Sequence, residues 1–199
     1  MKKYSSWHNG PEVPELGALK KELKRERYNR RFRRLLRSTV NALIVVAAVA
    51  ALVATLVLPV LQIAGTSMEP SLMDGDIILL VKTDQLKNGD LCAFYYSNKI
   101  LIKRIIAIPG DYIWMNPDGT VFLNGEALDE PYVSQKALGE CDVEFPYQVP
   151  ENNYFVMGDK RETSIDSRSS VIGCIQEDQM VGKIIFRVWP LTEFSFFGN

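Results

Sequence analysis

Two residues that are 36 positions apart could together cleave an acyl bond. Ser67 lies in the segment Gly65-Thr66-Ser67-Met68-Glu69-Pro70, and the only histidine of the chain is His8, far upstream. A serine hydroxyl attacks a carbonyl carbon only when a neighbouring base takes its proton. Lys103, which follows the apolar run Ile100-Leu101-Ile102, is the candidate base. This pair predicts a serine–lysine hydrolase.

A lysine can act as a base only if its amine is uncharged. In water the pKa of lysine is about 10.4, and burial can lower it by up to about 3–5 units. The runs Ile77–Val81 and Ile100–Ile108 are apolar at successive positions, which predicts strands that are covered on both faces. Lys103 would then be poorly hydrated. The alternative is a lysine that reaches solvent or pairs with a carboxylate.

Other residues could support such a pair. Gly65 would let the backbone approach an oxyanion, and Met68 and Leu72 could form an apolar wall for a small substrate side chain. In the segment 158–168, Ser164 could orient a neutral lysine, while Asp166 and Arg168 could form an ion pair that fixes the loop. The alternative for this segment is a solvated loop with balanced charges.

A long apolar segment precedes these residues. Val40–Leu61 contains 22 residues without a charge, and about 20 apolar residues span a bilayer as a helix. Residues 1–61 carry 12 Lys/Arg and 4 Asp/Glu, whereas residues 62–199 carry 11 and 20. The positive-inside rule then places the N-terminus in the cytoplasm, with the arginines of the inner flank being Arg30, Arg31, Arg33, Arg34 and Arg37.

Two alternatives to a transmembrane helix are a cleaved secretory signal and a buried core helix. The segment is longer than the apolar core of a cleaved secretory signal. The predicted organisation is a basic cytoplasmic segment over residues 1–39, a transmembrane helix over 40–61 and an extracytoplasmic catalytic domain over 62–199. A polar N-terminal segment, Met1–Leu19, is expected to be disordered.

The charge and cysteine patterns narrow the expected partners. Because the basic stretch Lys20–Arg37 lies directly before the apolar segment, anionic lipids are its expected partner, and no nucleic acid is expected. Cys92, Cys141 and Cys174 have no zinc-site spacing, so neither a metal nor a cofactor is expected. A Cys141–Cys174 disulfide and three separate thiols are both open.

Beyond Gln62 the sequence is typical of an all-β domain. Short apolar runs alternate with turn residues, and Asn124-Gly125 after Val121–Leu123 is a hairpin signature. A short helix is expected at Glu177–Val181. The predicted fold is mostly β, a compact antiparallel barrel or sandwich preceded by one transmembrane helix. The remaining expected strands are Leu91–Tyr96, Tyr154–Met157 and Lys183–Trp189.

Four segments, in order, resemble the type I signal peptidases of the Gram-positive type. The resemblance covers roughly residues 62–190 and includes Asn124-Gly125 and Glu130-Pro131-Tyr132. The four segments are Gly65–Leu72, Gly75-Asp76, Lys103–Asp111 and Gly158–Arg168.

The resemblance implies an antiparallel β domain that cleaves exported preproteins after small residues at positions −1 and −3. Ser67 would be the nucleophile, Lys103 the general base and then the acid, and Ser164 the residue that orients the lysine. The Ser67 N–H would donate to the oxyanion, and Gly65 stands where some members have a second donor. The strands around Ile63 and Ile102 would bind the extended substrate.

Two other functions fit parts of the sequence. A self-cleaving serine–lysine protease of the LexA-like kind would share the chemistry, but the apolar segment Val40–Leu61 and the absence of a DNA-binding half argue against it. An inactive anchored β domain that serves as a binding module would not need Ser67 or Lys103.

Overall fold

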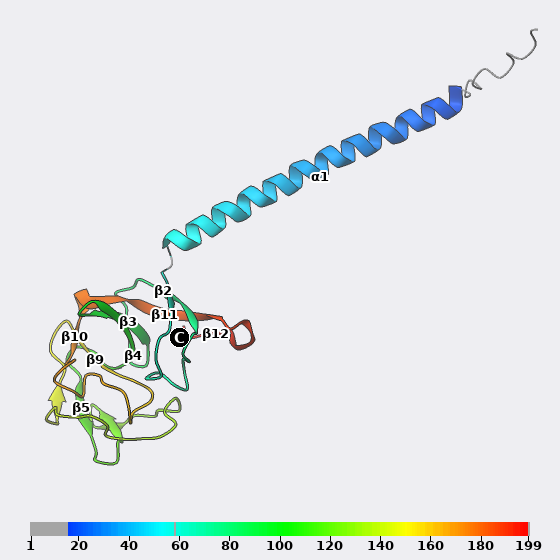
Figure 1. The fold of residues 1–199 in the computed structure, drawn as a ribbon. Coiled ribbons are helices and arrows are strands. Elements are labelled where there is room, and N and C mark those ends of the chain that lie inside the picture. The colour runs from blue at the N-terminus through cyan, green and yellow to red at the C-terminus, as the bar shows by residue number, and fades with distance from the viewer. Residues whose placement is uncertain (1–15, 58, 199) are drawn as a thin grey trace, which may run out of the picture. The chain divides into compact units, whose positions relative to one another are not determined.

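The computed structural model describes residues 16–57 and 59–198, so His8 and most of the polar N-terminal segment lie outside the described residues. The chain divides into two compact units, Met1–Ala54 and Thr55–Asn199, and each is described by itself (Figure 1).

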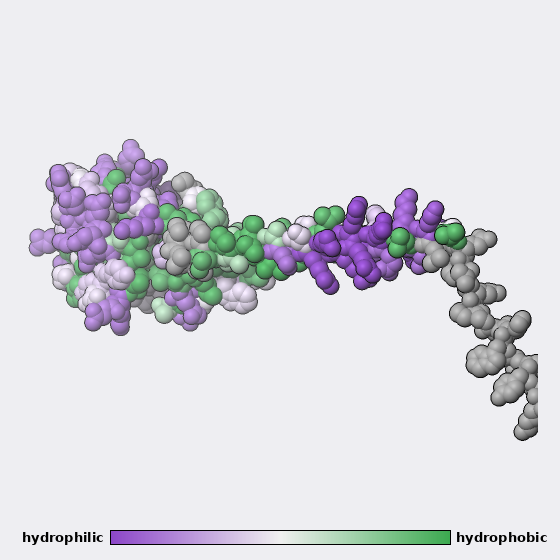
Figure 2. Space-filling model, turned by 90° about the horizontal axis from the view of Figure 1, so that it is seen from above, coloured by the Kyte–Doolittle hydropathy of each residue, from purple (hydrophilic) through white to green (hydrophobic). Residues whose placement is uncertain are grey.

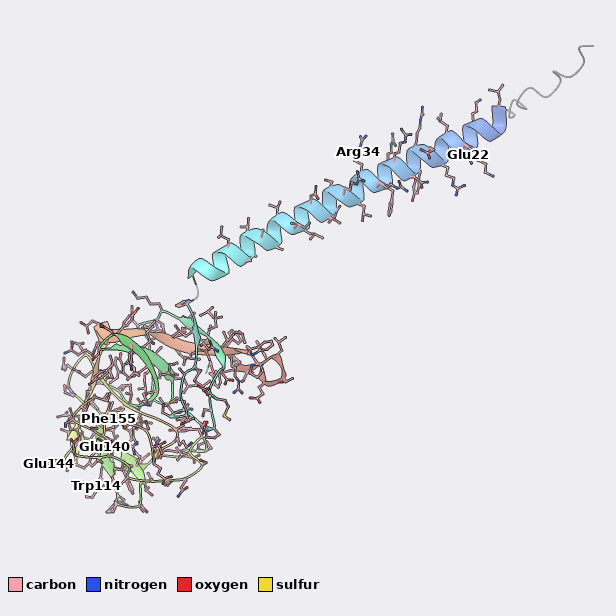
Figure 3. The ribbon with its side chains drawn as sticks, in the orientation of Figure 1. Glu22, Arg34, Trp114, Glu140, Glu144 and Phe155 are labelled. Carbon is pink, nitrogen blue, oxygen red and sulfur yellow. The ribbon has the colours of Figure 1, made fainter. Side chains whose placement is uncertain are left out.

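The first unit is built on one helix, α1 (Leu16–Val57). No glycine or proline interrupts residues 18–57, so nothing in this stretch favours a kink. The N-terminal half is hydrophilic, with charged side chains such as Glu22 and Arg34 projecting from it, and the following part is hydrophobic (Figures 2 and 3). Lys20–Leu52 is long and apolar enough to cross a membrane, judged by length and composition.

The helix is shorter at its C-terminal end than the sequence predicted. The expected apolar helix ran to Leu61, but the described helix ends at Val57 and a strand, β1 (Val60–Gln62), follows. Pro59 explains this end, because proline has no N–H for a helical hydrogen bond and its ring clashes with the preceding turn.

Within residues 59–198 the strands form two antiparallel sheets. The larger sheet has the order β1-β2-β11-β3-β4-β9-β10, with β12 paired to β11. Its other strands are β2 (Ile77–Val81), β3 (Leu91–Tyr96), β4 (Lys99–Ala107), β9 (Asn153–Met157), β10 (Ile175–Gln176), β11 (Met180–Trp189) and β12 (Ser195–Phe196). The mostly antiparallel β fold class is therefore confirmed.

The smaller sheet has the order β7-β6-β5-β8. Asn124 and Gly125 both adopt positive φ, 51° and 90°, and form the predicted two-residue hairpin between β6 and β7. The strands are β5 (Tyr112–Met115), β6 (Val121–Leu123), β7 (Glu126–Ala127) and β8 (Tyr147–Gln148).

Two further sequence expectations need correction. The helix expected at Glu177–Val181 is a single 3-10 turn, η1 (Glu177–Gln179), because the chain enters β11 at Met180. A second such turn is η2 (Leu191–Glu193). β2 is not covered on both faces; buried Ile78 and Leu80 alternate with partly exposed neighbours, as in a sheet with one inner face.

The structure also decides between the two alternatives that the sequence left open for the cysteines. All three are free thiols, so the Cys141–Cys174 disulfide is not formed. Cys141 Sγ contacts the carbonyl oxygen of Val143, and Cys174 Sγ contacts the hydroxyl of Tyr147.

One apolar core joins the turn that carries Ser67 to the sheet. Met68 and Leu72 are buried in the same cluster as Ile78, Leu80 and Leu91, and Ile100 and Ile102 of β4 pack against it. This contact brings residues 63–72 against the first half of β4, where the lysine lies.

Candidate active site

A tight turn before Ser67 is fixed by backbone hydrogen bonds. Ile63 N–H donates to the Asp76 carbonyl at 2.8 Å, and Gly75 N–H donates to the Ile63 carbonyl at 3.0 Å. Gly65 has φ of 102°, a conformation that favours glycine, and its N–H donates to Asp74 Oδ1 at 2.8 Å. The Asp74 side chain thus holds the turn from outside.

Lys103 is buried in the middle of β4, with 5% of its surface exposed. Its Nζ lies 2.8 Å from Ser67 Oγ, within hydrogen-bond distance. The two residues that the sequence singled out are therefore brought together. Among the described residues, no ion pair includes Lys103.

Burial lowers the pKa of the Lys103 ammonium below its ordinary value. The Asp166 carboxylate opposes this effect and the Arg168 guanidinium adds to it, while Asp159 and Cys92 oppose it more weakly. The predicted depression of the lysine pKa therefore has burial as its main cause. The neighbouring thiol is no rival nucleophile, since burial raises the pKa of Cys92 to about 12.

The loop 158–168 closes over the other side of Ser67. Lys160 N–H donates to the Ser67 carbonyl at 3.1 Å, and Gly158 N–H donates to Asp166 Oδ2 at 2.9 Å. Arg168 Nε and Nη2 each donate to Asp166 at 2.8 Å, and both side chains are fully buried. The ion pair expected between Asp166 and Arg168 is present and fixes this loop.

Ser164 lies in this loop but does not make the expected hydrogen bond. It is 1% exposed, and its Oγ has no hydrogen-bond partner among the described residues. Gly158 lies against it, since a Cβ added there would collide with the Ser164 side chain and with the Ser67 carbonyl oxygen. The hydroxyl is thus buried next to the site without being bonded to Lys103.

A cleft of about 130 Å³ opens beside the serine and the lysine. Ile63, Met68 and Ile102 line it, as expected of substrate-binding residues, together with Gly65, Ser67 and Lys103. Leu72 does not: it is fully buried in the core and does not line the cleft. The sequence also missed Leu61, Ala64 and Ile100, which line the same cleft.

Arg104, the residue after the lysine, links β4 to the loop 158–168. Its Nε and Nη2 donate to the two oxygens of Asp159 at 2.9 and 2.7 Å, and Nη2 also donates to Ser71 Oγ at 3.1 Å. Lys103-Arg104 and Gly158-Asp159 both lie in segments that carry the family resemblance. Only the fold shows that these two segments meet.

Comparisons with known proteins show the family of the chain. The family model described as "Signal peptidase, peptidase S26" matches residues 36–189. Signal peptidase IB of Staphylococcus aureus is 37% identical over 154 residues, which are 67% of this chain and 79% of that protein. Signal peptidase I of Bacillus licheniformis is 37% identical over 144 residues, 66% of this chain and 76% of that protein.

A crystal structure of a signal peptidase I from Enterococcus faecalis V583 is 26% identical, with a TM-score of 0.43, and covers 50% of this chain and 97% of that chain.

The fold and the site define a class of protein. It is an antiparallel β protein with one N-terminal apolar helix and a buried serine–lysine contact. With the family model covering most of its length, the chain belongs to the S26 family of signal peptidases.

Proposed function

We propose that this chain is a membrane-anchored endopeptidase that removes N-terminal signal peptides from exported preproteins, cutting after small residues of the Ala-x-Ala type. Ser67 is the nucleophile and Lys103 the general base. The observation that carries the proposal is the 2.8 Å contact between Lys103 Nζ and Ser67 Oγ at a buried position without a carboxylate partner for the lysine in the described chain.

The first half of the reaction needs an uncharged amine. Lys103 accepts the hydroxyl proton as Ser67 Oγ attacks the carbonyl carbon of the scissile peptide bond. The Ser67 N–H has no acceptor within the part of the chain that the structure describes, so it can donate to the oxyanion. The Lys103 ammonium then gives the proton to the leaving amine, and an acyl ester on Ser67 remains.

The second half returns the enzyme to its starting state. Lys103, again neutral, takes a proton from water, the resulting nucleophile attacks the ester carbonyl, and the proton passes to Ser67 Oγ as the ester breaks. Ser164, Asp166 and Arg168 act in support: the ion pair holds the loop, and Ser164 offers an unpaired hydroxyl that can orient the amine. Gly65 lets the substrate carbonyl approach the turn.

Two free sheet edges beside the cleft support an extended substrate. β1 is the edge strand of the larger sheet, and β4 pairs with β9 only through residues 104–107. Ile63 and Ile102 lie at these edges and line the cleft with Met68. A preprotein segment can add as a strand here, and a cleft of about 130 Å³ accommodates only small side chains.

The helix supports anchoring. Its apolar part exposes large hydrophobic side chains, including Leu43, Ile44 and Val46, that suit a lipid environment. The basic residues before it give the orientation, with the N-terminal segment 1–39 in the cytoplasm at anionic lipids, the span from 40 to the helix end at Val57, and the catalytic domain outside. No metal, cofactor or nucleic acid takes part.

A cleavage assay tests the proposal. The detergent-solubilised chain is incubated with a labelled preprotein that has an Ala-x-Ala site, and the new N-terminus is sequenced. We expect a single cut after the last alanine, no cut by Ser67→Ala or Lys103→Ala, and normal cutting by Lys99→Ala, an exposed lysine of the same strand. Full activity of Lys103→Ala at neutral pH would contradict the assigned base.

A further inference from the structure

A segment without regular secondary structure touches three arginines near the active site. They are Arg104 of β4 and Arg161 and Arg168 of the loop 158–168. Residues 130–139 connect the smaller sheet's β7 to β8, and we refer to them as the strap. Glu130 lies at one end of the strap, and Gly139, with φ of 65°, lies at the other, close to the Arg161 carbonyl and the Arg168 guanidinium.

Each arginine meets the strap in a different way. Arg161 and Glu130 form a fully buried ion pair, with Arg161 Nη2 2.5 Å from Glu130 Oε1. Arg168 Nη1 donates to the Leu138 carbonyl at 2.7 Å. The Tyr132 ring covers the guanidinium of Arg104, with Cζ 3.8 Å from the ring centre.

The Arg104 guanidinium has every edge occupied. Nε and Nη2 bind Asp159, Nη2 also binds Ser71, and Nη1 donates to the Gly89 carbonyl at 2.8 Å. The Tyr132 ring lies on one of its faces, so it keeps water from competing for the Asp159 carboxylate there. A cation held against an aromatic face is further stabilised by the ring quadrupole.

The position of Arg104 matters because Asp159 acts on the lysine. A carboxylate near Lys103 favours the ammonium, and Arg104 neutralises this one. The charged or polar groups that act on Lys103 come from the serine turn, from β3 and β4, and from the loop 158–168. They are Ser67, Cys92, Asp159, Asp166 and Arg168, and Arg104 enters through its ion pair with Asp159.

We propose that Tyr132 is a positioning residue of the active site, which holds the Arg104 guanidinium on the Asp159 carboxylate and so limits how strongly this carboxylate favours a charged Lys103. The inference rests on the proposed function, since it assigns Tyr132 to the same serine–lysine chemistry. It gives the strap a role beyond stability.

The test is the pH dependence of kcat/KM for the preprotein, measured with the full-length chain in detergent. Without the ring, Asp159 is less well neutralised and more of Lys103 is protonated at a given pH. We expect Tyr132→Leu to move the acid limb to higher pH by about 0.5–1 unit, which lowers kcat/KM about 3- to 10-fold on that limb while the high-pH plateau is kept. Tyr132→Phe keeps the ring and should restore the wild-type profile.

Tyr112→Leu is the matched control, because Tyr112 is a half-exposed tyrosine of the smaller sheet. Its profile should equal the wild type. A purely structural role for Tyr132 would lower activity by the same factor at every pH, and this result would overturn the proposal. If Tyr132→Leu does not fold, Tyr132→Met, which fills the volume without a ring, decides by the same shift; loss of folding in both variants would also overturn it.

The assay separates the two hypotheses. No cleavage by the wild-type chain would refute the proposed function. Cleavage by the wild type, loss in Ser67→Ala and an unshifted Tyr132→Leu profile would refute the role of Tyr132 alone.

Discussion

Two buried lysines in one row of the larger sheet have opposite partners. Lys183 of β11 pairs in register with Cys92 of β3, and Cys92 pairs with Lys103 of β4. Lys183 Nζ lies 2.6 Å from Asp90 Oδ1 in a nearly buried ion pair. Lys103 Nζ instead lies 2.8 Å from a hydroxyl.

The difference shows that burial alone does not make a lysine into a base. A carboxylate compensates a buried ammonium, so the contact of Lys183 with Asp90 is a structural ion pair. A hydroxyl cannot compensate it, and burial then favours the neutral amine. The group at hydrogen-bond distance therefore decides which lysine can take a proton. It is the Asp90 carboxylate for Lys183 and the Ser67 hydroxyl for Lys103.

The largest expected effect is on the cleavage rate, which should distinguish Lys103 from Lys183. Lys103→Ala removes the proposed general base and should lower kcat/KM for the preprotein by a factor of about 10²–10⁴. Lys183→Ala, tested below its unfolding temperature, should cleave within a few-fold of the wild type. The measurement is the initial cleavage rate of both variants at pH 8, and equal losses in the two would remove the distinction between the lysines.

Replacing each of the two lysines by methionine should change the free energy of unfolding in opposite directions. Lys183→Met leaves Asp90 buried without its partner and should lower the free energy of unfolding by about 3–5 kcal/mol. Lys103→Met removes a buried amine that has no carboxylate partner and should raise it by about 1–2 kcal/mol. Urea unfolding of the catalytic domain in the full chain gives both values. A destabilised Lys103→Met would show that the amine is better compensated than we infer.

The pH dependence of kcat/KM tests whether the Lys103 amine acts in its neutral form. Because the pKa of Lys103 is lowered in the folded chain, kcat/KM should rise about tenfold per pH unit below that pKa and level off above it. The folded state binds fewer protons than the unfolded state between the lowered pKa and the ordinary one, so this lysine makes stability increase with pH across that window. Maximal activity at pH 5 would be incompatible with an amine base.

The smallest effect concerns a third lysine beside the site. Lys160 Nζ lies 2.9 Å from Glu69 Oε2, and both side chains are partly exposed, at 39% and 27%. Such a pair contributes about 0–1 kcal/mol, since solvent and salt screen it. Lys160→Ala should therefore change the unfolding free energy by less than about 1 kcal/mol and kcat/KM by less than about threefold. Glu69→Ala is the reciprocal variant, and a tenfold loss in either would give this pair a direct role in the reaction.

Local sequence patterns predicted much of the framework. The uncharged run Val40–Leu61 predicts a membrane-spanning helix because of its length and apolar composition, and the end at Val57 follows from Pro59. β3 and β6 have the predicted bounds, and Asn124-Gly125 makes the predicted turn because both residues tolerate positive φ. Ser67 and Lys103 were chosen from residue chemistry, since the sequence offers no histidine in residues 62–199.

Other features depend on contacts between distant segments, which no local pattern encodes. The strap meets the three arginines across 28 to 31 positions of sequence, and Lys183 of β11 meets Asp90, the residue before β3. Leu72 was expected in the cleft and lies in the core, because the turn after Ser67 directs it there. The sequence determines which side chains can carry charge or protons; only the tertiary structure decides which of them meet, because the charge of a buried lysine depends on the atom within hydrogen-bond distance of its nitrogen.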